Sequence, residues 1–360
     1  MSSWFIGSEI YRLEVFQPPH PLAVPRAMLV HDVCCALNWL PTSKYLESFP
    51  ASRAELRNFH TADYISALQQ AEVEQSLPPE MQALYRIGID SNAIHPAVFR
   101  RPATSAGGAI MAASLTADGG VVYAPGVGNH HGMPDRASGF CFVNDIALGI
   151  LRWRELGVRR VVYLDLDAHH GDGVEAAFAN DPDVLTISIH EAGRWPRTGT
   201  VSAPSRGVWN FAVPAGFNDT ELRFLLEAKI LPLIKTHAPE AMIVLPGADA
   251  LEDDPMSRLS LSNNALWDAV RAVRGLAPRL AVFGGGGYNP YSLARCWAGV
   301  WAILNDIEMP LHLPPAVQEL LRGVAYFRAA GRNPPARWFE QLRDAPAEGP
   351  VRDEVKGLCV

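Results

Sequence analysis

The sequence contains few cysteines, and they follow neither a disulfide pattern nor a metal-binding pattern. Five cysteines occur among 360 residues, at Cys34, Cys35, Cys141, Cys296 and Cys359. None has the Cys-x-x-Cys spacing of a structural zinc site, and their density is far below that of a disulfide-stabilised domain. We therefore expect reduced thiols in a cytoplasmic protein.

Long apolar runs and an excess of positive charge are also missing. No segment reaches the ~18 consecutive apolar residues that a membrane-spanning helix requires. The opening residues, MSSWFIGSEIYRLEVF, lack the basic stretch and apolar core of a secretory signal. The formal net charge of −7 provides no electrostatic footprint for nucleic acid. With 48% hydrophobic and 19% charged residues, the sequence predicts a globular protein without a membrane or nucleic-acid partner.

Internal repeats and breaks in composition are absent, so we expect residues 1–360 to form a single domain. Short apolar runs alternate with segments of helical spacing, and the tail after about Arg332 is expected to pack as a peripheral helix. The expected strands are Gly120–Ala124, Val161–Asp167, Val184–His190, Trp209–Val213, Met242–Pro246 and Leu280–Gly284. The expected helices are Asn144–Leu156, Gly173–Ala179, Asp219–Thr236 and Asn263–Leu276. This alternation predicts an α/β fold, a three-layer domain with a central, mainly parallel sheet flanked by helices.

Polar and glycine-rich clusters follow five of the expected strands. In chain order they read PGVGNHHG, DLDAHHGDG, HEAGRWPRTG, GADALEDDP and GGGGYNP. Because right-handed crossovers place the carboxyl ends of parallel strands along one edge, we expect these clusters to converge on one crevice.

Two carboxylates and one imidazole in these clusters predict a metal site. Asp167 and His169 are two residues apart, so on a strand their side chains would point the same way, and Asp249 follows another strand. Any one of them could instead be a helix cap or a core histidine, but their repeated placement at strand ends favours metal binding. Three protein ligands leave one position open, as in catalytic zinc sites.

A binuclear manganese site of the arginase type is the nearest alternative. Such a site needs further carboxylates two positions after the ligands, where this chain has Gly171 and Leu251. One metal is therefore predicted, and a site rich in oxygen with one imidazole suits zinc, with iron(II) as the alternative.

Adjacent histidines in the first cluster predict acid/base chemistry. His130 and His131 can face one substrate if the backbone turns between them, and Asp165 and Asp172 supply one carboxylate for each imidazole. A carboxylate on the far ring nitrogen fixes the tautomer and raises basicity. Two adjacent histidines in a loop usually have no catalytic role, so the prediction depends on the two aspartates.

The glycine run before Tyr288 matches neither a dinucleotide nor a Walker phosphate-binding pattern. Its alternative interpretation is that the glycines let the backbone approach a substrate while the tyrosine hydroxyl points into the site. A phenol can donate a hydrogen bond to a developing oxyanion. A purely structural tyrosine is the other interpretation.

Several motifs, in one order, resemble the zinc-dependent histone deacetylase family and its arginase–deacetylase fold. The resemblance runs from about His20 to Trp297 and is greatest to bacterial acetoin-utilisation and class I enzymes. The motifs are HPLAVPRAMLVHD, NHHGMPDRASGFCFVND, VVYLDLDAHHGDGVEAAF, GADALEDDPM and GGGGYNPYSLARCW.

This resemblance assigns roles to residues of the metal and proton-transfer groups. The zinc ligands would be Asp167, His169 and Asp249. The other roles would be general base and acid for His131 with Asp172 behind it, electrostatic neighbour for His130 oriented by Asp165, and carbonyl activation for Tyr288.

It also implies a substrate channel and bound potassium. The channel for an acyl-lysine would be lined by Gly139, Phe140, Trp195 and Met256, with a backbone contact at Gly286 and an acetate-release path near Arg26. Potassium would lie near Asp165, Asp167, His169, Ser188 and Ile189, and a less specific second site near Phe178, Asp181 and Val184.

The sequence departs from the family pattern at the rim. Asn129 replaces an apolar residue, Asp90 only loosely matches a substrate-gripping aspartate, and Arg194 makes the channel mouth more charged. The predicted activity is metal-assisted hydrolysis of acetyl-lysine in proteins, and the alternative is a small acylated amine such as an acetylpolyamine. A silent acyl-lysine binder would require loss of Tyr288 or of the histidine pair, and both are present.

Overall fold

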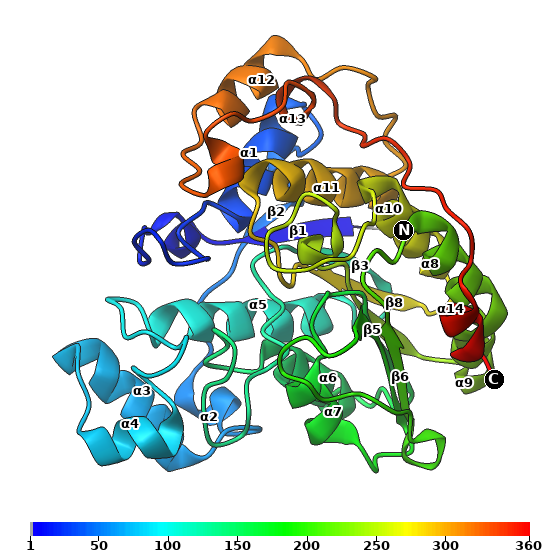
Figure 1. Cartoon of the computed structure of the whole chain (residues 1–360). Coiled ribbons are helices and arrows are strands. Elements are labelled where there is room, and N and C mark those ends of the chain that lie inside the picture. Colours follow the sequence, from blue (N-terminus) through cyan, green and yellow to red (C-terminus); the bar gives the residue numbers. More distant parts are fainter. Residues whose placement is uncertain (1–2) are drawn as a thin grey trace.

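A sheet of eight parallel strands forms the middle of three layers in the computed structural model, which describes residues 3–360 (Figure 1). The strand order is β2-β1-β3-β8-β7-β4-β5-β6. The strands are β1 (Ser3–Gly7), β2 (Tyr45–Glu47), β3 (Gly120–Ala124), β4 (Val161–Asp165), β5 (Val184–Glu191), β6 (Val208–Val213), β7 (Ala241–Leu245) and β8 (Arg279–Phe283). The predicted fold, with a parallel sheet between helices, is confirmed.

Helices cover both faces of the sheet (Figure 1). One face carries α1 (Ala27–Ala36), α8 (Asp219–Leu225), α9 (Leu231–His237), α10 (Asn263–Val273), α11 (Pro290–Leu304), α12 (Pro315–Arg322), α13 (Arg337–Glu340) and α14 (Asp353–Gly357). The other carries α2 (Arg53–Leu56), α3 (Ala62–Glu74), α4 (Pro79–Tyr85), α5 (Arg100–Leu115), α6 (Asp145–Glu155) and α7 (Asp172–Phe178). No helix formed by residues 3–360 is long and apolar enough to cross a membrane.

Strands β3 and β7, and β4 up to Asp165, are apolar on both sides because helices cover both, whereas β5 alternates apolar residues with Thr186, Ser188 and His190. Every residue of β3, β4, β5 and β7 is buried. Continuous apolar runs of this kind are typical of parallel strands in α/β proteins. All six predicted strands are confirmed as β3 to β8, whereas the sequence did not reveal β1 and β2, which are short and lie at one edge of the sheet.

The predicted helix Asp219–Thr236 is confirmed as one continuous helical run with a local irregularity in its middle. The segment Leu226–Ile230 between α8 and α9 has a wider helical turn. Pro232 stands at the start of α9 and has no backbone N–H to donate to the preceding turn. The three other predicted helices are confirmed as α6, α7 and α10.

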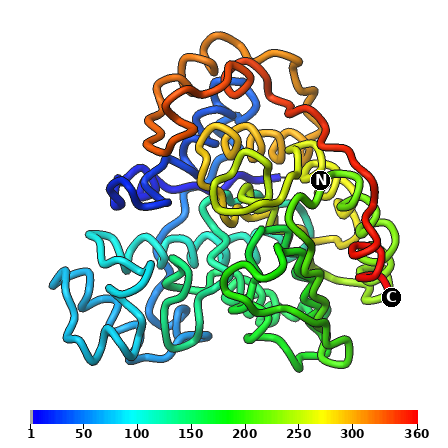
Figure 2. Tube along the Cα trace, viewed as in Figure 1, coloured from blue at the N-terminus to red at the C-terminus, as the bar shows by residue number. Residues whose placement is uncertain are grey.

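The C-terminal segment lies along the outside of the helical layer instead of forming one peripheral helix (Figure 2). Only the short helices α13 and α14 form, and an extended stretch with Pro346 and Pro350 joins them. Proline cannot continue a helix from its interior, which explains the correction. The stretch is fastened to the core where Asp219 accepts a hydrogen bond from Ala347 N and where Glu221 binds Arg352.

The crossing of α10 and α11 depends on a glycine, which gives a prediction about stability. A methyl group at Gly299 would lie 2.1 Å from Cζ2 of Trp267, whose indole N–H donates to Cys296 O at 2.7 Å. We expect Gly299→Ala to lower the free energy of unfolding by roughly 1–3 kcal/mol. Urea unfolding checks this, with Gly357→Ala as the control because its added methyl meets open space. An unchanged or higher midpoint for Gly299→Ala would contradict the close packing.

Candidate active site

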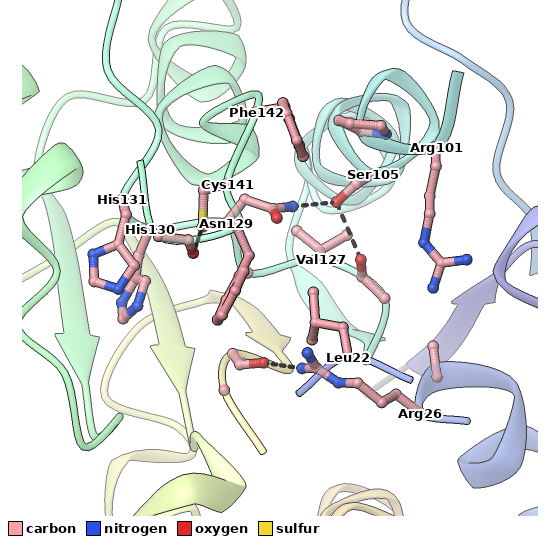
Figure 3. A pocket seen from close by; sticks show the side chains of 18 of the residues that line it. Leu22, Arg26, Arg101, Ser105, Val127, Asn129, His130, His131, Cys141 and Phe142 are labelled. Carbon is pink, nitrogen blue, oxygen red and sulfur yellow. Dashed lines mark hydrogen bonds between the residues drawn. The ribbon is translucent and has the colours of Figure 1, made fainter. Parts of the chain in front are cut away.

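Loops after β3, β4 and β8 at the carboxyl edge of the sheet line a cavity of about 130 Å³, together with the N-terminal segment around Arg26 and the start of α5. The loops after β5 and β7 adjoin these walls, because Trp195 packs against His131 and Asp249 lies beside His169, so the loops after all five strands meet as predicted. The cavity reaches from the histidine pair on one side to Arg26 and Arg101 on the other (Figure 3). Residues far apart in the chain therefore line one cavity.

The predicted metal ligands are brought together. Nδ1 of His169 lies 3.2 Å from Oδ1 of Asp167 and 2.9 Å from Oδ2 of Asp249, and all three side chains are buried. Ligand atoms bound at ~2.0–2.2 Å to one tetrahedral ion are about 3.3–3.6 Å apart. The observed spacing and the donor types therefore fit a single small divalent cation.

The reason these ligands converge differs from the one that the sequence suggested. Strand β4 ends at Asp165, so Asp167 and His169 lie in the loop beyond it, and strand alternation does not orient them. Backbone amides do so instead: His169 N donates to Asp167 at 2.9 Å, and Ala168 N donates to Asp249 at 3.0 Å. Asp249 lies in a single helical turn, Ala248–Ala250, after β7.

The glycine run packs directly against the metal ligands. Gly286 N donates to Asp167, and a Cβ at Gly286 would lie 2.0 Å from Oδ2 of Asp249. Gly285 and Gly287 have φ of +98° and +146°, which side chains disfavour. Gly286 was expected to offer a backbone contact to substrate; it lines the cavity and also makes room for the carboxylates.

The charge distribution of this cluster favours a bound cation. Burial raises the pKa of the Asp249 carboxyl, and the neighbouring charge of Asp167 raises it further. Burial lowers the pKa of His169, but its hydrogen bonds to the two carboxylates outweigh burial and raise it to about 10. Negative charge concentrated in so small a buried volume requires a positive partner.

Each histidine of the adjacent pair is held by its predicted aspartate. Nδ1 of His130 lies 2.8 Å from Asp165, and Nδ1 of His131 lies 2.7 Å from Asp172. The Nε2 side of the ring then remains for the cavity, and Nε2 of His130 is 3.8 Å from Oδ1 of Asp167. The imidazole centroids are 3.9 Å apart, so the rings act on the same small volume.

The pKa values of the two imidazoles are shifted in opposite directions. Burial lowers the pKa of His130, but the charges of Asp165 and Asp167 outweigh burial and raise it to about 9. Burial and the charge of His130 lower the pKa of His131 to about 4, although Asp172 opposes the shift. Neighbouring groups whose pKa values are driven apart can divide acid and base roles.

Tyr288 borders the same cavity, as predicted for it. Its backbone N–H donates to Asp254 at 2.6 Å, and its ring lies 6.2 Å from that of Phe140. Burial and the charge of Asp249 raise the pKa of the Tyr288 hydroxyl, so it remains protonated and can donate a hydrogen bond. Arg26 lies 5.8 Å from the Tyr288 ring and donates to Gly285 O (Figure 3).

The predicted channel residues lie at the outer side of the cavity. Gly139 and Phe140 have φ of +53° and +67°, and a Cβ at Gly139 would lie 2.2 Å from the Trp195 ring. Trp195 is 45% exposed and meets His131 edge-on at 4.6 Å, so it stands at the mouth. Met256 lines a groove beside Trp195 rather than the cavity itself.

The inner end of the cavity contains Asn129, which was expected at the rim, and Arg101 and Ser105, which sequence reasoning missed. Asn129 Nδ2 donates to Ser105 Oγ at 3.0 Å, and Arg101 lies 5.3 Å from the ring of Tyr11 (Figure 3). Arg101 and Ser105 share one face of α5 by their spacing of four residues. Nothing else in the sequence connects that helix with the strand-end clusters.

The predicted potassium site and the predicted substrate contact of Asp90 stay predictions. Strand register pairs Asp165 with Ser188, whose hydroxyl is 2.9 Å from Nδ1 of His190. Asp90 pairs with Arg86 and does not line the cavity. Among the residues that the structure describes, Asp167, His169 and Asp249 are the only group with metal-ligand spacing.

Comparison with known proteins gives concordant matches. The profile of the histone deacetylase domain matches residues 20–304. The chain is similar to the acetoin utilization protein AcuC of Bacillus subtilis, with 33% identity over 87% of this chain and 84% of that protein. It is 33% identical to histone deacetylase 8 of Xenopus tropicalis over 80% of each chain. A crystal structure of an HDAC homolog complexed with SAHA superposes with a TM-score of 0.94 and 34% identity, covering 100% of this chain and 99% of that one.

Loss of one carboxylate should weaken metal binding. We expect the protein to bind one zinc ion per chain, and Asp249→Asn to weaken that binding by more than about 10-fold, since a charged ligand is removed. Metal content after equilibrium dialysis measures this. Glu252→Gln, an exposed carboxylate three residues away, is the matched control and should bind like wild type.

The glycine contact yields an independent test of the same cluster. Gly286→Ala should reduce zinc affinity at least about 10-fold, because its methyl would collide with Asp249 and move a ligand. Gly149→Ala serves as control, since its methyl would make an ordinary 3.4 Å contact in α6. Unchanged zinc affinity in Gly286→Ala would show that the cluster does not need the close approach of this loop.

Proposed function

The chain belongs to the histone deacetylase family, and from that premise we propose that it hydrolyses N-acyl amides, with acetylated lysine side chains of proteins as substrates. One observation supports this most directly. A single cavity is lined by Asp167 and His169 of the Asp–His–Asp cluster, by two histidines each held by a carboxylate, and by Tyr288. Metal-assisted amide hydrolysis uses a metal-binding cluster, a proton-transfer group and an oxyanion donor close together.

We propose zinc as the cofactor, held by Asp167, His169 and Asp249. Two carboxylates and one imidazole with a further position free form the donor set of a catalytic site. A divalent ion bound there supplies a Lewis acid and lowers the pKa of water toward ~7. The short distances between the ligand atoms and the room left by Gly286 support this proposal.

The histidine pair would move the protons. His131, which is neutral, accepts a proton from the attacking water at Nε2 and returns it to the leaving lysine amine. Asp172 on Nδ1 keeps the ring in the tautomer that this requires. His130, held by Asp165, carries positive charge beside the reacting carbonyl and limits proton uptake by His131.

Tyr288 would bind the carbonyl oxygen as negative charge develops on it. Its raised pKa keeps the hydroxyl proton in place, and Tyr288 lines the same cavity as the two histidines. Gly139 and Trp195 would form the walls around the lysine stem, with Phe140 and Met256 at its other sides.

Two further proposals concern the surroundings of the site. A potassium ion near Asp165, Asp167, His169, Ser188 and Ile189 would brace the loop after β4, and the pairing of β4 with β5 supports it. The whole chain would form the catalytic domain of a cytoplasmic enzyme. The attachment of the C-terminal segment through Asp344 to the buried Arg295 supports the domain assignment.

The charge of the mouth favours a protein substrate over an acetylpolyamine. Arg194, Arg197 and Arg258 line the groove beside the entrance. A polyamine retains positive charge after acetylation at one end and would be repelled by these groups. The side chain of an acylated lysine within a peptide is uncharged, so these groups do not repel it.

Removing the phenol hydroxyl tests the proposed mechanism. Tyr288→Phe should lower kcat on an acetyl-lysine peptide by roughly 10²–10³-fold with a much smaller change in KM, since the hydrogen bond matters most in the transition state. Steady-state kinetics measures both constants. Tyr326→Phe is the matched control, because that buried hydroxyl has no hydrogen-bond partner among residues 3–360. A wild-type kcat in Tyr288→Phe would remove the phenol from the mechanism.

The same assay decides the substrate class. Acetyl-lysine peptide and acetylspermidine are compared on zinc-loaded protein, and we expect the peptide to have the higher kcat/KM. A preference for acetylspermidine would contradict acetylated protein lysines as the substrates, and the proposal of amide hydrolysis would still stand.

A further inference from the structure

A second, more open hollow of about 430 Å³ lies beside the cavity mouth. We call it the arginine groove and define it by Glu191, Arg194, Trp195, Arg197, Met256 and Arg258. One wall comes from the loop after β5 and the other from the loop after β7. It adjoins the reaction site but supplies none of the groups assigned to proton transfer.

The groove is continuous with the site through shared residues. His169 lines both hollows, and the Trp195 ring lies 6.4 Å from His169 and 4.6 Å from His131. A peptide whose acyl-lysine enters the cavity past Trp195 must place its neighbouring residues along the rim. The groove is therefore within reach of side chains next to the acylated lysine.

A single buried carboxylate holds the two walls together. Glu191, which is 7% exposed, binds the guanidinium of Arg194 and accepts a hydrogen bond from Arg258 N at 2.8 Å. Arg194 thus neutralises Glu191 within the wall. The carboxylate is used internally and leaves no net negative charge facing the groove.

Two other guanidinium groups remain available. Arg197 and Arg258 are exposed, and within residues 3–360 neither lies at ion-pair distance from a carboxylate. Arg328 approaches the sulfur of Met256 at 3.7 Å and adds a third positive charge at the same edge. This concentration of positive charge stands on a chain whose formal net charge is −7.

We propose that the arginine groove binds carboxylate side chains that flank the acyl-lysine, so that the enzyme prefers peptides with aspartate or glutamate next to the acylated residue. The planar guanidinium matches a carboxylate in geometry as well as in charge. Positive charge at a mouth also raises the association rate of anionic ligands, an effect that salt screens. This inference rests on the proposed acyl-lysine hydrolysis and specifies its substrates.

Three acetyl-lysine peptides of equal length test the proposal, with aspartate, asparagine or lysine on both sides of the acylated residue. For the wild-type protein we expect kcat/KM to fall in that order. The ratio of the aspartate to the asparagine peptide should be roughly 3–10 at low salt. It should approach one above about 0.5 M salt, where the screening length is only a few ångströms.

The double variant Arg197→Gln/Arg258→Gln should lower the ratio at low salt to near one. Arg57→Gln is the matched control, since it removes one exposed arginine far from the groove, next to Asn58, which binds Glu155 at the end of α6 that points away from the site. That variant should keep the wild-type ratio. Thermal unfolding and zinc content of every variant establish that fold and metal site are intact.

The outcomes separate the two levels of the argument. Equal kcat/KM for the aspartate and asparagine peptides, or a ratio that survives in the double variant, would overturn the groove assignment and leave the deacetylase proposal standing. Failure of zinc-loaded wild-type protein to hydrolyse any of the three peptides would overturn the proposed function, and the groove assignment with it.

Discussion

The cost of burying several carboxylates in one small volume governs the construction of this protein. Asp165, Asp167 and Asp249 are almost fully buried within the same edge of the sheet. An uncompensated buried carboxylate is prohibitively unfavourable, so each must find hydrogen-bond donors or positive charge. The backbone amides of residues 168, 169 and 286 supply donors, and the imidazoles of His130 and His169 supply charge. A divalent cation bound by Asp167, His169 and Asp249 would take the place of the His169 proton as the positive charge, because a metal-ligating imidazole is neutral.

That requirement explains features which otherwise look unrelated. Amide donors can surround a point only where several loops meet, and parallel strands bring their following loops to one edge. Close approach of the last loop needs residues without side chains, hence the glycines around Gly286. The apolar strands beneath anchor the loops, since every residue of β4 and β7 is buried.

The parts of the fold and site that sequence reasoning predicted are those with a strong local pattern. Strands β3 to β8 were predictable because burial on both faces makes them mainly apolar runs, whereas β2 has only three half-buried residues. The ligands and the histidine pair were predictable because aspartate, histidine and glycine interrupt those runs. The reason for their convergence was not, because loop geometry and amide donors leave no periodic signal. Arg101 and Ser105 escaped for a related reason, since their role comes only from the packing of α5 against the loop after β3.

The hydrogen bonds of Glu191 have a consequence for sequence variation at the mouth of the cavity. Because one buried carboxylate fixes both walls of the mouth, the side chains at positions 197 and 258 stand on a rigid frame and contribute little to it. Substitutions at these two positions can therefore change the charge of the arginine groove without moving the walls that carry it. In this architecture, the reacting groups and the charges at the entrance can change independently of each other.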